Sequence, residues 1–133
     1  MSLQIVPTSP PHETLQPAST ERFVAENFDR AYLLFNLFID DPRACLDHSD
    51  AVFRTLARQG AYTDRGFYRT LAQRIRALPQ SADAVEGQDV DSVLCWLLKD
   101  AAALNYAAIA DVMELERDQV AARIAGVRGV LAG

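Results

Sequence analysis

Apolar side chains recur every three or four residues along almost the whole chain from Glu21 onward, which is the period of an α-helix buried on one side. Six helical segments are expected, and no segment is a convincing strand. The pattern therefore predicts an all-α fold. With 133 residues, 50% of them hydrophobic, the chain can bury the core of one domain or of two very small ones.

Proline and glycine mark where the helices end. Asp41-Pro42 ends the first helix and begins a second, and Gly60 is suited to the end of that second helix. The segment YTDRG (62–66) is expected to be a loop, followed by a third helix from about Phe67 to Leu78. A fourth apolar stripe covers 90–104, and two shorter helices follow it.

Two polar segments divide the chain. Residues 1–20 are rich in proline and lack an apolar period, so we expect a disordered tail. The segment PQSADAVEGQD (79–89) has several turn-forming residues and is expected to be a linker. These boundaries predict two three-helix units, 21–78 and 90–133.

Charge and hydropathy exclude several classes of protein. No apolar run approaches the ~20 residues of a membrane helix, and the N-terminal sequence is unlike a secretory signal, so we expect a cytoplasmic protein without a membrane partner. The net charge of −5 disfavours strong, independent DNA binding, because contacts to phosphates supply most of that affinity.

Residues that could carry chemistry are few and scattered. Cys45 and Cys95 lie inside apolar patterns and are expected to be reduced, buried thiols. No pair of potential ligands, including His12 and His48, has zinc-like spacing, so we expect no metal and no cofactor. The chain has no glycine-rich phosphate loop and no Ser/His/Asp arrangement, and it is not expected to be an enzyme.

The segment NYAAIADVMELERDQVAARI (105–124) has the layout of a DNA-binding helix-turn-helix, with two short amphipathic helices joined by a tight turn. We call the second of these the reading helix. The alternative is an ordinary solvated helix face, which also carries Asp118. The candidate DNA contacts are Asn105, Tyr106, Arg117, Gln119, Arg123 and Arg128.

The same segment resembles region 4 of the extracytoplasmic-function sigma factors. The phrase from Leu104 to Ala110 resembles the family's Leu-Ser-Tyr-x-x-Ile-Ala, and Gln119 to Ile124 resembles Thr-Val-x-x-Arg-Leu. The phrases DPRACLDHSDAVF (41–53) and YRTLAQRI (68–75) resemble region 2 of the family, in the expected order. The resemblance covers about residues 22–131 and implies a region 2-like unit followed by a region 4-like unit.

In that family, region 2 binds the RNA polymerase core. Asp47 aligns with the family's acidic position and Asp50 with its glutamine, so the resemblance implies that these two residues, together with the neighbouring His48, contact the polymerase. Asp47 and Asp50 are three residues apart and share one helix face. An ordinary acidic, solvated face is the alternative.

Several positions depart from the family pattern. Glu114 stands where the turn usually has glycine, Glu116 where serine is usual, and Leu71 and Gln73 replace aromatic residues of the helix that captures the opened promoter strand. The reading helix also lacks most of the family's basic residues, with Ala121, Gly126, Gly129 and Val130 in their place.

These departures indicate a degenerate member of the family. We expect a sigma-like transcription regulator that acts through the RNA polymerase core, at initiation or elongation, with DNA binding that is weak or assisted by a second DNA-binding protein. Two alternatives stay open. One is a decoy that mimics a sigma factor and binds an anti-sigma factor without a DNA step. The other is a plain helix-turn-helix repressor, usually dimeric.

Overall fold

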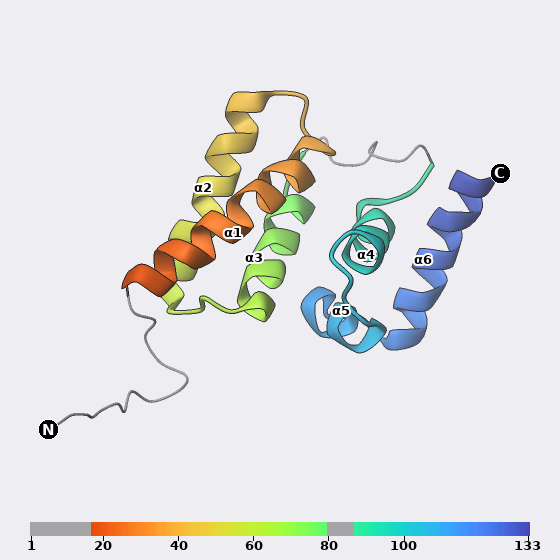
Figure 1. Ribbon diagram of the computed structural model, residues 1–133. Coiled ribbons are helices and arrows are strands. Elements are labelled where there is room, and N and C mark those ends of the chain that lie inside the picture. Colours follow the sequence, from red (N-terminus) through yellow and green to blue (C-terminus); the bar gives the residue numbers. More distant parts are fainter. Residues whose placement is uncertain (1–16, 80–86) are drawn as a thin grey trace, which may run out of the picture.

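The computed structural model describes residues 17–79 and 87–133, and within these residues it contains helices and no strand (Figure 1). The all-α class is therefore confirmed. The helices are α1 (Pro17–Asn36), α2 (Pro42–Gln59), α3 (Asp64–Arg76), α4 (Val90–Asp100), α5 (Tyr106–Met113) and α6 (Arg117–Ala132).

The ends of α2 follow the predicted signals. The Asp41 side chain accepts a hydrogen bond from the backbone N–H of Arg43 at 3.0 Å, and Pro42 occupies the first turn, where a missing N–H costs nothing. Gly60 ends the helix in the left-handed conformation, with φ 64°. Its backbone N–H caps the last turn by donating to the carbonyl of Ala57.

Three predicted boundaries are wrong. Helix α1 begins at Pro17, so residues 17–20 are helical and do not belong to a disordered tail. The rest of that predicted tail, 1–16, lies outside the described residues. Helix α4 ends at Asp100 and does not continue to Leu104, because Ala103 turns the chain with φ 61° and Leu104 donates back to the Leu98 carbonyl at 3.0 Å.

The third error concerns the start of α3, which begins at Asp64 inside the segment expected to be a loop. Thr63 caps the helix by accepting a hydrogen bond from the backbone N–H of Gly66 at 3.0 Å. Gly66 is required there, since a Cβ at this position would lie 2.5 Å from the carbonyl oxygen of Ala61. The close approach of backbone to backbone, and not a turn, explains this glycine.

One cluster of buried side chains joins both halves of the molecule. In the first half, Phe53 of α2 stacks on Phe28 and Phe67 with ring centroids 5.9 and 5.7 Å apart. In the second half, α4 and α6 pack side by side, and the cluster continues from α3 into α4 and α5 (Figure 1). The predicted linker lies mostly at 80–86, outside the described residues, so the division into two units stays a prediction.

Three arginines of α3 form ion pairs with carboxylates of the second half, and we call these pairs the α3 seam. Arg65 binds Asp111 through two hydrogen bonds of 2.5 and 3.1 Å, and Arg76 binds Asp91 through two of 2.7 and 3.1 Å. The third pair joins Arg69 to Glu114 in the turn between α5 and α6. The seam places three cations of one helix opposite anions of the other half.

Candidate nucleic-acid and polymerase interfaces

Helices α5 and α6 are joined by a three-residue turn, Glu114 to Glu116. Glu114 has φ 59°, in the left-handed region that glycine adopts more easily, and Leu115 donates to the Ala110 carbonyl at 3.0 Å across the turn. The two helices pack through buried side chains, which are Ile109, Val112, Met113, Val120, Ile124 and Val127. The backbone thus forms two packed helices around a tight turn.

Two of the six predicted DNA contacts cap helices. Asn105 is the N-cap of α5 and accepts a hydrogen bond from the backbone N–H of Ala108 at 2.8 Å. Gln119 reaches back to the start of α6, where its Oε1 accepts from the backbone N–H of Glu116 at 2.8 Å. These amide groups are engaged in ordering the two helices.

Two of the three arginines on the reading helix are bound by α4. Arg123 Nη1 donates to both carboxylate oxygens of Asp89, each at 3.1 Å, and to the hydroxyl of Ser92 at 3.1 Å. Arg128 donates to Asp100, at the other end of α4, at 2.5 and 3.3 Å. Each ion pair neutralises part of the positive charge that would attract a DNA phosphate.

The pKa values of Asp89 and Asp100 are lowered, as expected for carboxylates that are paired with arginines. Burial alone would raise the pKa of Asp89, but hydrogen bonds from Ser92 and the nearby Arg123 guanidinium lower that pKa overall. The hydrogen bond from Arg128 lowers the pKa of Asp100. Both carboxylates therefore stay ionised at neutral pH and continue to hold their arginines.

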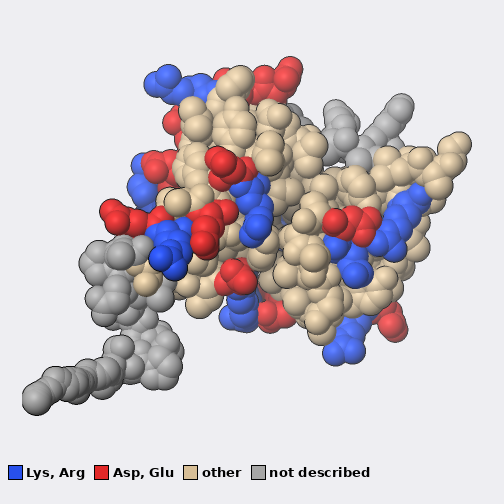
Figure 2. Space-filling view, in the orientation of Figure 1, with Lys and Arg blue, Asp and Glu red and all other residues tan. Residues whose placement is uncertain are grey.

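Tyr106 and Arg117 complete the predicted DNA contacts. Tyr106 is exposed, and the Lys99 ammonium lies 5.6 Å from the centre of its ring. Arg117 is exposed and forms no ion pair with any residue that the structure describes. On the face drawn in Figure 2, basic and acidic side chains alternate and leave no continuous basic area.

The structure separates the three predicted polymerase contacts. Asp47 and Asp50 are exposed on α2, and Asp50 pairs with Arg54 at 2.8 Å. His48 lies roughly 160° around the helix from Asp50. It is half-buried, stacked on Phe35 with ring centroids 5.3 Å apart, and its Nδ1 accepts a hydrogen bond from Arg74 Nε at 2.9 Å.

The environment of His48 favours its neutral form. Burial lowers the pKa of the imidazole, the adjacent Arg74 guanidinium lowers it further, and Asp47 opposes this change. Asp47 and Asp50 thus form an exposed acidic face, whereas His48 belongs to the contact between α2 and α3.

Sequence reasoning missed Asp89 and Asp100 as partners of the reading helix. Asp89 could have been recognised as the N-cap of α4, since its side chain accepts from the backbone N–H of Ser92 at 2.8 Å. Nothing in the spacing of the chain signals that either carboxylate meets α6. This pairing depends on how α4 and α6 pack.

The cysteines are buried and free, as predicted, and burial raises the pKa of the Cys95 thiol to about 11. Across 17–79 and 87–133, no three His, Cys, Asp or Glu side chains are arranged to hold a metal ion. None of the helices in these two ranges combines the length and the apolar character needed to cross a bilayer.

Comparisons with known proteins gave no relatives: no family model, no curated protein and no solved structure matches this chain.

Proposed function

We propose that this protein is a sigma-like transcription regulator that works in the cytoplasm by binding the RNA polymerase core, with weak or assisted contact to DNA. The observation that carries the proposal is the combination of a helix-turn-helix backbone with a reading helix on which two of the three arginines form ion pairs with carboxylates at the ends of α4. Arg123 and Arg128 form ion pairs with Asp89 and Asp100, so Arg117 is the arginine of that helix without an ion pair among the described residues.

Weak DNA binding follows from this arrangement. A helix that neutralises few phosphates releases few counterions, and its affinity at physiological salt is small. The first half supports the same conclusion. Leu71, which stands where the sigma family has an aromatic residue that stacks on the opened strand, is 1% exposed and buried in the core.

The exposed acidic face of α2 supports binding to the polymerase. Asp47 and Asp50 are exposed on α2, whereas Val52, roughly 150° around the helix from them, is buried. A charge-assisted hydrogen bond from a basic partner to Asp47 is worth roughly 1.5–3 kcal/mol, or about 10- to 100-fold in affinity. Asp47 forms no ion pair within the described part of the chain, so it is available to such a partner.

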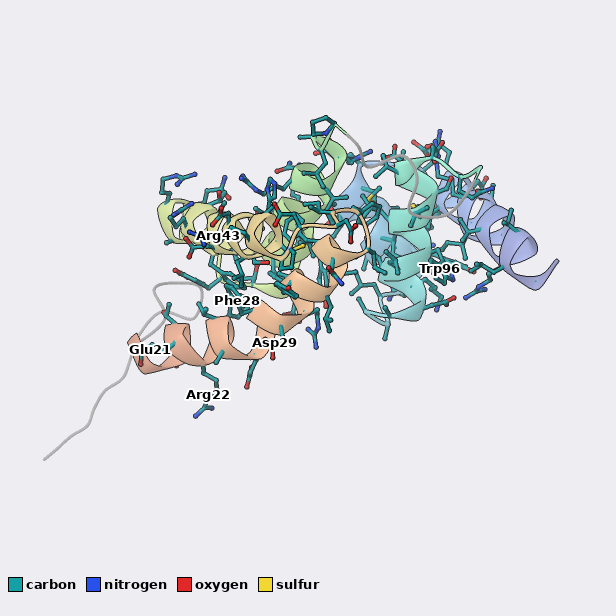
Figure 3. All side chains as sticks on the ribbon, turned by 90° about the horizontal axis from the view of Figure 1, so that it is seen from above. Glu21, Arg22, Phe28, Asp29, Arg43 and Trp96 are labelled. Atoms are coloured by element: carbon teal, nitrogen blue, oxygen red, sulfur yellow. The ribbon has the colours of Figure 1, made fainter. Side chains whose placement is uncertain are left out.

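The test is the binding of purified RNA polymerase core to wild type and to Asp47→Arg. We expect the variant to bind at least about 10-fold more weakly, because it removes an attraction and adds repulsion. Glu21→Arg is the matched control: it makes the same change of charge near the start of α1 (Figure 3) and should bind as wild type does. Equal binding by wild type and Asp47→Arg, or no binding by either, would overturn the proposal.

A second candidate is a sigma-mimicking decoy that binds an anti-sigma factor. It is favoured by a groove of about 410 Å³ between α1 and α4, which is lined by leucine and alanine side chains and by three charged residues of α1. Leu33 and Leu37 on its α1 side are 63% and 52% exposed, which is typical of a surface that contacts protein. Co-purification with a small anti-sigma protein in place of polymerase subunits would favour this candidate.

A further inference from the structure

A hollow of about 480 Å³ lies between α2 and α3, on the side of α2 that carries His48. Its polar lining consists of His48 and Thr55 from α2 and of Thr70, Gln73 and Arg74 from α3. Apolar side chains, including Ile39, form the rest of the wall. Among the described residues that line the hollow there is no carboxylate, although the chain as a whole has a net charge of −5.

Thr70 is a buried hydroxyl without a hydrogen-bond partner in the described structure. It is 8% exposed. Two comparable hydroxyls on α2 donate to the carbonyl four residues earlier, Ser49 to Cys45 at 2.7 Å and Thr55 to Ala51 at 2.9 Å. Buried hydroxyls are nearly always bonded, because an unmade hydrogen bond is costly. Among the described residues, the Thr70 hydroxyl on the wall of the hollow therefore has no acceptor for its proton.

Arg74 forms no ion pair with a carboxylate among the described residues. Its Nε donates to His48 Nδ1 at 2.9 Å, and its Nη1 and Nη2 form no hydrogen bond with a described residue. The accepting Nδ1 carries no proton, so the imidazole is neutral and does not compensate the charge of Arg74. Asp47 is adjacent in sequence to His48 but does not line the hollow. By contrast, the arginines of the α3 seam and of α6 that contact α4 each bind a carboxylate.

A second guanidinium, which does not itself line the hollow, bonds to one of the lining residues. Arg58 Nη2 donates to the Thr55 hydroxyl at 3.2 Å, and Arg58 has no carboxylate partner in the described residues. The wall of the hollow thus combines a guanidinium and a hydroxyl that have no acceptor for their Nη and Oγ1 donors among the described residues, together with apolar side chains. This is the donor set that an oxyanion with an apolar body requires, since a guanidinium offers two parallel N–H groups to such a head group.

We propose that the hollow binds a small molecule with an oxyanion head group, a carboxylate or a phosphate, and an apolar body. The head group accepts hydrogen bonds from the Nη atoms of Arg74 and from the Thr70 hydroxyl. The apolar body lies against Ile39, Ala77 and Leu78. This site is separate from the exposed acidic face of α2 and does not depend on the proposed role in transcription.

The test is a titration of the full chain, followed by amide NMR shifts, with benzoate, phenyl phosphate and the uncharged benzyl alcohol. We expect benzoate or phenyl phosphate to give saturable shifts at Thr70, Gln73 and Arg74, with benzyl alcohol at least about 10-fold weaker because it lacks the charge. The tighter of the two anions identifies the head group. Failure of both anions to saturate, or equal binding of the alcohol, would overturn the proposal.

Two variants locate the site. Thr70→Val keeps the shape and removes only the hydroxyl, so we expect unchanged or higher thermal stability and roughly 3- to 10-fold weaker binding of the anion. Arg74→Gln should weaken binding by about 10-fold or more. Arg22→Gln, at an arginine that points away from α1 into solvent (Figure 3), is the control and should bind as wild type does.

If Arg74→Gln does not fold, Thr70→Val decides. Folded Thr70→Val with wild-type affinity would rule out the site as described.

Discussion

The guanidinium of Arg123 on the reading helix lies 3.1 Å from both carboxylate oxygens of Asp89, the residue that caps α4. Arg128 and Asp100 repeat this arrangement at the other end of α4. Helix α4 therefore holds two of the cations with which α6 would contact DNA. If α6 binds DNA as proposed, Asp89 and Asp100 compete with DNA phosphates for the two guanidinium groups.

Releasing the two arginines should strengthen DNA binding. In Asp89→Asn with Asp100→Asn, asparagine still caps α4 but no longer neutralises Arg123 and Arg128. We expect wild type to bind duplex DNA weakly with a shallow salt dependence, and the double variant to bind more tightly. Its slope of log affinity against log salt should steepen by up to about 1.8, at roughly 0.9 for each phosphate contact. Fluorescence anisotropy at several salt concentrations measures both quantities.

Glu21→Gln with Asp29→Asn is the control for net charge. Both side chains are exposed on α1, and Asp29 points away from the helix (Figure 3). Equal strengthening by this pair would show that net charge, and not the release of two arginines, controls affinity. Nanomolar, steeply salt-dependent binding by wild type would contradict the prediction itself.

The second prediction concerns the segment from Pro79 to Gln88. Its composition predicts preferred cleavage there by a protease at low concentration. Because the α3 seam and the shared core join the halves, we expect the two fragments to co-elute after cleavage in low salt and to separate more readily in 1 M salt, where exposed ion pairs are screened. Resistance to cleavage at this segment would argue against two separable units.

The third prediction concerns Ala103, which has φ 61° at the end of α4. An L side chain is strained in this conformation and glycine is not. Ala103→Gly should raise the free energy of unfolding by about 0.5–1 kcal/mol. Ala125→Gly, an exposed site in the middle of α6, should lower it by about 1 kcal/mol. Urea denaturation of both variants checks the opposite signs, and destabilisation by both would refute the argument.

The fourth prediction concerns pH. The folded state lowers the pKa of His48, so the unfolded state binds the proton more readily. Stability from this group is fully present above about pH 6.5, the unfolded value, and is lost as pH falls toward the folded pKa. The lowered pKa values of Asp89, Asp100 and Asp111 act only below about pH 4.

Thermal unfolding at pH 7.5 and 5.5 therefore isolates the histidine. Wild type should lose more stability between these values than His48→Gln, in which an amide oxygen can still accept from Arg74. An equal loss in both chains would show that His48 is not responsible.

The sequence predicted the ends of a helix well where the backbone conformation of a single residue determines them. Pro42 lies at the start of α2 and Gly60 at its end, because each residue has a conformational preference that no distant contact overrides. Gly66 misled the prediction, because a glycine beside Asp64 and Arg65 is typical of a loop. Its real reason is the approach of the Ala61 carbonyl, which depends on the path of the chain after α2.

The candidate sites were less predictable for the same reason. The spacing of Asp47 and Asp50 placed them together on one exposed face, as found. His48 is adjacent to Asp47 in sequence but faces Arg74 of α3, 26 residues further along the chain. The pairing of Arg123 with Asp89 joins residues 34 apart. Such contacts depend on how helices pack, and the periodicity of one helix does not contain that information.

The α3 seam has a consequence for how this chain changes over evolutionary time. Replacing Arg65 or Arg76 alone leaves a carboxylate of the opposite half without its cation, and the same holds in reverse for Asp111 and Asp91. A reversal of sign at one position is tolerated best when its partner reverses too. Among homologous chains that keep this packing, the members of each pair should therefore covary, and the two halves should be inherited as matched sets.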